Sequence, residues 1–290
     1  MKHPINAPLP IAEHGAVSAE LNVGGDRGPV ILDAYRADAT PGVRNRAEAE
    51  KSLRKQLQPK LADLHDRLMA AGQHGVLVVL QGLDGSGKSG TVKHVAAWLN
   101  PTGLSVASFK EPDPAEEAEH FLERIRRQLP APGSITFFDR SHYEDAIVPR
   151  SIGELDDEAF EQRLEEIRSF EVELAKAGTV IVKCLLHLSY DEQRERFLRR
   201  LHRPDKQWKF AESDLDTRDN WSRLQAAYAE VIGPTSIDVA PWFVVPADHK
   251  WYRNWAIASI LAEHLEALGS DYPPLDGDIE AFRARLEPPH

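Results

Sequence analysis

The sequence predicts an α/β protein in which helices flank a parallel sheet, and two patterns carry this prediction. Short apolar segments of strand length alternate with amphipathic segments long enough to form helices of ten or more residues. A glycine-rich loop separates the first of these strands from the helix that follows it. Strands separated by helices of this length pair in parallel and are covered on both faces.

The apolar segments are short and rich in Val, Ile, Leu and Phe, which is typical of buried parallel strands. We expect strands at 75–80, 105–109, 135–138, 179–187 and 242–245. Leucines recur at helical spacing between residues 46 and 71, and similar periodicity or helix-stop signals recur further along. We expect helices at 46–71, 88–99, 115–128, 154–177, 191–203, 216–232 and 251–268.

Composition excludes several classes of protein. The 290 residues are 42% hydrophobic and 28% charged, as in a globular protein with a core. No segment resembles a membrane helix or a secretory signal, so we expect a cytoplasmic protein without membrane contact. The single cysteine, Cys184, rules out an internal disulfide and is expected to be a buried strand residue. A net charge of −11 argues against binding nucleic acid.

The loop between the first strand and its helix has the spacing Gly82-x-x-x-x-Gly87-Lys88-Ser89. This is the P-loop (Walker A) pattern, in which backbone N–H groups and the start of the helix surround a phosphate. The expected phosphate-binding residues are Gly82, Gly85, Ser86, Gly87, Lys88 and Ser89. Lysine at this position reaches phosphate oxygens, and the hydroxyl of Ser89 is positioned to ligate magnesium.

Asp84 is an unusual residue for the inside of a phosphate-binding loop. A carboxylate facing phosphate is repelled unless a cation or an arginine lies between them. We therefore expect Asp84 to coordinate magnesium or to orient the acceptor phosphate, with a solvated loop carboxylate as the alternative.

A second candidate site follows the strand at 135–138, where Asp139 and Arg140 stand at the carboxyl end. Open α/β sheets bind ligands at this edge. An apolar strand that ends in aspartate, in a chain with a P-loop, predicts that Asp139 is a partner magnesium ligand. Arg140 can bind phosphate through paired donors, or it can form a structural ion pair.

Residues 193–209 carry seven basic residues against two acidic ones in a protein of net negative charge. Four arginines fall at i, i+3, i+4 and i+7, so we expect them on one helical face. This pattern indicates a mobile lid over a polyphosphorylated ligand. The alternative is a solvated surface with pairs such as Glu192–Arg196 and Glu195–Arg199. The candidate residues are Arg196, Arg199, Arg200, Arg203, Lys206 and Lys209.

Together these features predict phosphoryl transfer between phosphorylated substrates. A phosphate acceptor is already ionised at neutral pH, so the reaction needs positioning and charge neutralisation rather than a general base. The histidines show no metal-ligand spacing, and we expect them to be structural. We expect an irregular N-terminal arm at 1–45, a single P-loop phosphotransferase domain at 46–270 with the lid at about 190–232, and a C-terminal tail at 271–290.

Several segments resemble the second polyphosphate kinase family, the polyphosphate:nucleotide phosphotransferases. The likeness runs from about Glu48 to Leu268 and is most specific in four segments. These are Leu80–Thr91, Phe138–Asp145, Lys206–Phe210 and Ala240–Asp248.

The resemblance implies a thymidylate-kinase-like P-loop fold with a helical lid, and transfer between inorganic polyphosphate and AMP or ADP with Mg²⁺. It implies that Asp84, Lys88, Asp139 and Arg140 serve the nucleotide phosphates and the metal. Arg196, Arg200 and Lys209 are then expected to serve the lid and polyphosphate. Further residues that the resemblance places near nucleotide or phosphate are Gly90, Thr91, Asn100, Lys110 and Arg124. It also implies a homo-oligomer, either a dimer or a tetramer.

Two departures from the family pattern are informative. Glu123 stands where the family commonly has tryptophan, which puts the surroundings of Arg124 in question. Ser89 stands where the family often has glycine or aspartate, so Ser89 or the two aspartates could dominate magnesium binding. Two other functions fit the same motifs: an ATP-dependent nucleoside monophosphate kinase of the same fold, and a non-catalytic nucleotide-binding sensor.

Overall fold

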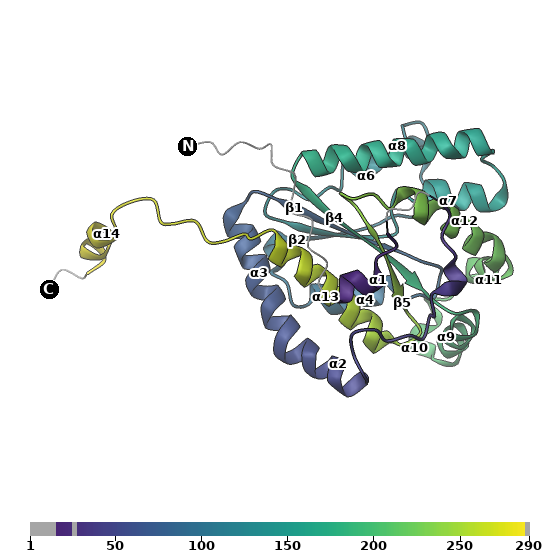
Figure 1. Ribbon diagram of the computed structural model, residues 1–290, viewed down its shortest axis with the longest axis horizontal. Coiled ribbons are helices and arrows are strands. Elements are labelled where there is room, and N and C mark those ends of the chain that lie inside the picture. Colours follow the sequence, from purple (N-terminus) through teal and green to yellow (C-terminus); the bar gives the residue numbers. More distant parts are fainter. Residues whose placement is uncertain (1–15, 25–27, 288–290) are drawn as a thin grey trace.

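A computed structural model describes residues 16–24 and 28–287 and has a five-stranded parallel sheet at its centre (Figure 1). The strand order is β2-β3-β1-β4-β5, and every neighbouring pair is parallel. This confirms the predicted α/β class. The strands are β1 (Gly75–Gln81), β2 (Leu104–Ser108), β3 (Ile135–Asp139), β4 (Thr179–His187) and β5 (Trp242–Pro246).

The central strand β1 sets the position of the site. All seven of its residues are buried, as expected for a strand covered on both faces. Leu80 near its end pairs with Asp139 of β3 on one side and with Cys184 of β4 on the other. Because parallel strands end at the same edge, the loop after β1 and the end of β3 lie next to each other.

Alternate residues of β1 point into two separate cores. Val76, Val78 and Leu80 pack in the core beneath α13, whereas Leu77 and Val79 pack in the core beneath α8. The first face is covered by α1 (Ala16–Leu21), α2 (Arg46–Ser52), α3 (Gln58–Ala71), α4 (Lys88–Ala96) and α13 (Lys250–Ala267). The second is covered by α7 (Glu144–Ile152), α8 (Asp157–Lys176) and α12 (Trp221–Thr235).

The predicted helix at 46–71 forms with one irregularity, because a π-helical turn, Leu53–Leu57, joins α2 to α3. The predicted helix at 115–128 is wrong: α5 (Pro114–Glu117) and α6 (Glu123–Arg126) are two short helices. Arg124 of α6 bonds to the Lys110 carbonyl and to Asp145, both at 2.8 Å, and these tertiary contacts override the helical periodicity.

The segment predicted as a lid, at about 190–232, contains three helices beyond the end of β4 and most of α12. They are α9 (Tyr190–His202), α10 (Pro204–Gln207) and α11 (Ser213–Asp219). Figure 1 places them together beside the carboxyl edge of the sheet. The helix expected at 216–232 is displaced, since α11 ends at Asp219 and α12 begins at Trp221.

The two ends of the chain differ in their contacts. Of the predicted arm, residues 1–15 and 25–27 lie outside the described part. The rest contacts the body: Leu21 is buried, and the Val23 amide donates to the Trp242 carbonyl of β5 (3.0 Å). At the other end, α14 (Ile279–Leu286) lies apart from the body at the end of an extended segment (Figure 1). Across the described ranges, we find no helix able to span a membrane.

Candidate active site

The P-loop runs from the end of β1 to the first turn of α4 and depends on glycine at two positions. Gly82 has a φ of 143°, and a Cβ there comes within 2.7 Å of the Leu186 carbonyl oxygen. Gly87 has a φ of 99°, and a Cβ there comes within 2.0 Å of the Arg253 guanidinium. Only glycine fits both the backbone conformation and the space at these positions. The loop therefore passes tightly between β4 and α13.

The side chain of Lys88 is buried and folds back toward the start of the P-loop. Its Nζ donates to the Gly82 carbonyl at 2.6 Å and lies 3.5 Å from the Leu83 carbonyl. Both of these contacts are to backbone carbonyls of the loop. The positive charge of Lys88 therefore lies within the loop, at the position where a P-loop lysine contacts phosphate.

Ser89 and Asp139 meet at the end of the loop. The Ser89 hydroxyl donates to Asp139 Oδ2 at 2.5 Å. Their contact joins the start of α4 to the end of β3 and brings together two residues that the sequence proposed as magnesium ligands. The described residues contain no group of three or more His, Cys, Asp or Glu side chains that could hold a metal. A hydroxyl and one carboxylate nevertheless fit Mg²⁺, which is bound by one or two protein ligands with phosphates and water.

Asp84 is held by an arginine and a hydroxyl. Its Oδ1 accepts from Arg140 Nη2 at 2.6 Å, and its Oδ2 accepts from Thr217 at 3.2 Å. Burial acts to raise the pKa of Asp84, but Lys88, Arg140 and the Thr217 hydroxyl together hold it below the usual value. The carboxylate is therefore ionised, and an arginine contacts it as the sequence argument required.

Arg140 adopts a conformation that is unusual for a residue with a side chain. Its φ of 66° makes it the one non-glycine residue in the left-handed region within the described ranges. Its amide donates to the Leu80 carbonyl at 3.1 Å, and its Nε lies 3.8 Å from Glu144. This turn directs the guanidinium to Asp84 and toward the P-loop. Backbone strain of this kind is typical of functional sites.

The basic face of α9 divides into one buried arginine and several exposed ones. Arg196 is 5% exposed, and its guanidinium bonds to the carbonyls of Gly85 and Ser86 at 2.9 Å. It also donates to the carbonyls of Ala247 and Asp248. Arg196 therefore joins the P-loop to the segment before α13, and its donors are engaged by the protein itself.

The remaining basic residues of this segment lie nearer the surface, and most have a carboxylate partner. Arg199 is 52% exposed and contacts Glu192 at 2.6 Å rather than Glu195, which pairs with Arg194. The Glu192–Arg196 pair of the alternative interpretation does form, at 2.9 Å. The other contacts are Arg200–Asp214, Arg203–Asp205 and Lys206–Asp205, and Lys209 lies over the Trp208 ring.

The other predicted residues fall into two groups. Ser86 is fully buried and its hydroxyl has no partner in the described structure, while Gly90 and Thr91 lie in the first turn of α4. Arg124 and Lys110 contact each other near the carboxyl end of β2. Asn100 caps the short helix before β2 and lies at the opposite edge of the sheet, so it is not brought to the P-loop.

Arg253 and Gln193, like Thr217, contact the loop and were missed from the sequence. Arg253 of α13 is 3% exposed and donates to the Ser86 carbonyl at 2.8 Å. Burial, with Arg196 adding to it, lowers the pKa of Arg253 to about 9. Gln193 donates to the Asp84 carbonyl at 2.8 Å. Both lie more than 100 residues from their partners, and no local pattern signals such contacts.

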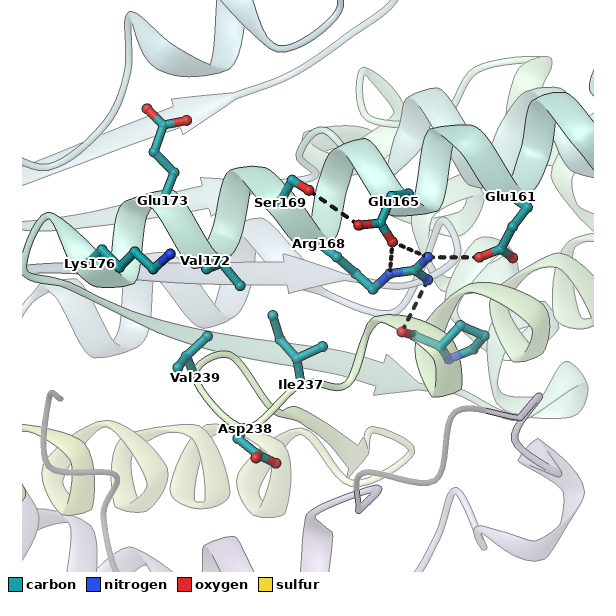
Figure 2. A pocket seen from close by; sticks show the side chains of 11 residues that line it. Glu161, Glu165, Arg168, Ser169, Val172, Glu173, Lys176, Ile237, Asp238 and Val239 are labelled. Carbon is teal, nitrogen blue, oxygen red and sulfur yellow. Dashed lines mark hydrogen bonds and ion pairs between the residues drawn. The ribbon is translucent and has the colours of Figure 1, made fainter.

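A surface pocket lies at the opposite edge of the sheet. It is bounded by α8 and the segment 234–239 that leads into β5 (Figure 2). Arg168 in its wall pairs with Glu161 and Glu165, both at 2.7 Å. Because this segment precedes β5, the pocket lies at the amino ends of the strands. The P-loop is at the carboxyl ends, so the pocket is separate from it.

Comparison with known proteins gives one consistent result. The family model described as polyphosphate kinase 2 matches residues 44–272. An AMP/ADP-polyphosphate phosphotransferase of Meiothermus ruber is 43% identical over 242 residues, which cover 83% of this chain and 91% of that protein. An ADP-polyphosphate phosphotransferase of Rhodopseudomonas palustris is 37% identical, with coverage of 86% and 90%. The crystal structure of polyphosphate kinase 2 from Arthrobacter aurescens TC1 is similar, with a TM-score of 0.90, 36% identity, and coverage of 94% and 97%.

Proposed function

The chain belongs to the polyphosphate kinase 2 family, and we propose that it transfers a phosphoryl group between inorganic polyphosphate and nucleoside mono- or diphosphates. AMP to ADP and ADP to ATP are the proposed conversions. One relative is named an AMP/ADP-polyphosphate phosphotransferase and another an ADP-polyphosphate phosphotransferase, and these names support this choice of substrates.

The observation that carries the proposal is the meeting of two sets of charged residues beside the P-loop, at one edge of the sheet. On one side, the P-loop holds Lys88 and ends at the Ser89–Asp139 contact of 2.5 Å. On the other, Nη2 of Arg140, which follows β3, lies 2.6 Å from Oδ1 of Asp84, which belongs to the P-loop. Cations therefore lie around a loop that is shaped for phosphate, as phosphoryl transfer requires.

Phosphoryl transfer in kinases generally uses a divalent metal, and we propose Mg²⁺ for this chain. Ser89 and Asp139 are the proposed ligands because their oxygens are adjacent, whereas Asp84 is engaged by Arg140 and Thr217. When bound, Mg²⁺ neutralises charge on the phosphate oxygens. Asp84 then has a different proposed role, which is to hold the Arg140 guanidinium in position beside the loop.

The protein residues have distinct proposed tasks in the reaction. Backbone N–H groups of the P-loop and the start of α4 bind the phosphate chain. Lys88 and Arg140 neutralise charge on the group in transfer, and the acceptor phosphate attacks without a general base because it is already ionised. For the second phosphorylated substrate we propose the exposed cations of α9 and α10, whose carboxylate partners a polyanion can replace.

The experiment that tests this function compares phosphoryl donors. Wild-type enzyme is assayed with Mg²⁺ and AMP, ADP, GMP or GDP as acceptors, with either long-chain polyphosphate or ATP as donor, and each product is identified. ATP formed from ADP and polyphosphate supports the proposal. No turnover with polyphosphate, together with rapid AMP phosphorylation by ATP, favours a nucleoside monophosphate kinase. Binding without any transfer favours a sensor.

A further inference from the structure

A buried lysine lies in the middle of the sheet, behind the site. Lys183 of β4 has no exposed surface, and its neighbours across the strands are Val79 and Trp242. Its ammonium group donates to Glu171 at 2.6 Å, to the Thr235 carbonyl at 2.7 Å and to a tyrosine hydroxyl at 2.9 Å. All of its hydrogen-bonding capacity is used inside the protein. Lys183 therefore contacts no substrate.

Glu171 and Tyr143 complete the cluster. Glu171 of α8 is fully buried, and the Tyr143 hydroxyl donates to it at 2.8 Å while accepting from Lys183. Burial raises the pKa of Tyr143 well above its usual value, so the hydroxyl keeps the proton that it donates. Burial also acts to raise the pKa of Glu171, but Lys183 and His142 outweigh it and lower this pKa. Glu171 is therefore an ionised partner for Lys183.

Stability alone is a poor reason for this arrangement. Removing two charges from water costs free energy, and apolar residues of similar volume often replace a buried ion pair without loss of stability. The sheet around Lys183 is already filled by large apolar side chains such as Trp242 and Phe138. A polar cluster at this depth is better explained by what it holds in place.

The cluster of Lys183, Glu171 and Tyr143 lies against the turn that carries the candidate catalytic groups. Tyr143 follows Asp139 and Arg140 by four and three residues, and its amide donates to Ser141 Oγ at 3.2 Å within this turn. Arg140 is in the left-handed conformation, which persists only where the surrounding structure over-determines it. The Tyr143 hydroxyl fixes the end of the turn to β4 and α8 at the same time.

We propose that Tyr143, held by Lys183 and Glu171, is a positioning residue that sets the Asp139–Arg140 turn for phosphoryl transfer. The proposal rests on the proposed function, because it assumes that this turn serves the transferring phosphate. It also requires that the hydroxyl matters through geometry and without touching the substrate.

The test is the variant Tyr143→Phe, which keeps the ring and removes the hydroxyl. We expect kcat to fall about 10- to 100-fold, the effect of a misplacement near 1 Å, while KM for the nucleotide stays within about twofold. The matched control is Tyr252→Phe, since Tyr252 is also fully buried and its hydroxyl has no partner in the described structure. The control should keep the wild-type kcat. An unchanged kcat in Tyr143→Phe overturns the proposal, even if Tm falls.

A second variant separates positioning from folding. The double substitution Lys183→Met with Glu171→Leu removes both buried charges together, so neither charge is left unpaired. We expect the variant to fold with a lowered Tm, because the Thr235 carbonyl and the Tyr143 hydroxyl lose buried partners, while kcat falls as in Tyr143→Phe. A folded double variant with full kcat overturns the proposal. Assays use whichever donor, polyphosphate or ATP, the wild type accepts, so a failure of the proposed donor leaves this comparison intact.

Discussion

The strand-end site and the α9–α10 surface both place charges near the P-loop, but they hold those charges differently. At the strand end, Lys88 and Asp139 are buried and bonded to the loop itself. On the α9–α10 surface, Arg199 and Arg203 are more than half exposed, and each contacts a single carboxylate. Exposed ion pairs contribute about 0–1 kcal/mol, so a polyanion can replace them easily. We therefore expect the first region to be preset for chemistry and the second to exchange its partners.

Arg196 shows that the boundary between the two regions runs through a single helix. It belongs to α9 by sequence, but its guanidinium donates to four backbone carbonyls, two of them in the P-loop. By structure, therefore, Arg196 belongs to the preset region.

The largest effect is expected from Lys88→Ala. Losing one preorganised cation at the transferring phosphate should lower kcat/KM about 10²- to 10³-fold, as with the loss of one oxyanion-hole donor. Steady-state kinetics measure this, with the exposed Lys93→Ala on the same helix α4 as the control. Equal activity of both variants would place the phosphate site elsewhere.

Arg196→Ala should combine lost stability with lost activity. The substitution leaves buried carbonyls of the P-loop unpaired, which should cost about 2–4 kcal/mol in the free energy of unfolding. Urea denaturation measures the change, and Arg194→Ala, which removes an exposed arginine from the same helix, is the control. A stability loss no larger than that of the control would contradict the buried role seen in the structure.

Arg199→Ala tests the α9–α10 surface and should leave the free energy of unfolding within about 0.5 kcal/mol of the wild-type value. We expect KM for polyphosphate to rise about 3- to 10-fold, since one charge contact of up to about 1.4 kcal/mol accounts for a factor of ten. KM for the nucleotide should change less, and added salt should reduce the difference between variant and wild type. Equal increases in both KM values would argue against a polyphosphate surface on α9.

The smallest effect is expected from removing α14. Truncation after residue 272 deletes a helix that has no buried residues and lies apart from the body. We expect kcat, both KM values and Tm to match those of the full chain within error. A clear loss of activity would show that the tail contributes to the site.

The sequence predicted best those features that depend on local residues. The strand–loop–helix arrangement and the place of Asp139 and Arg140 at a strand end were predictable because glycine spacing and a strand end are short-range patterns. The spacing of Arg196, Arg199 and Arg200 placed them on one face, but periodicity cannot tell what packs against that face. Only the structure shows that Arg196 is buried and donates to two carbonyls of the P-loop.

Other contributors could not be predicted because their partners are far away in the chain. Arg253 meets Ser86 across 167 residues, and Lys183 meets Tyr143 across 40. In the sequence, Lys183 is only a single charge within an apolar strand. The two short helices α5 and α6 were mistaken for one helix for a similar reason, since the contact of Arg124 with Asp145 decides the local path.

We propose above all that the Ser89–Asp139 end of the P-loop carries out phosphoryl transfer with a metal. The most direct test measures ATP formation from ADP and polyphosphate by Asp139→Asn, alongside ADP binding by calorimetry. We predict that the rate falls about 10²-fold or more while ADP still binds, because the lost charge acts mainly on the transferring group. A wild-type rate in Asp139→Asn would contradict the claim.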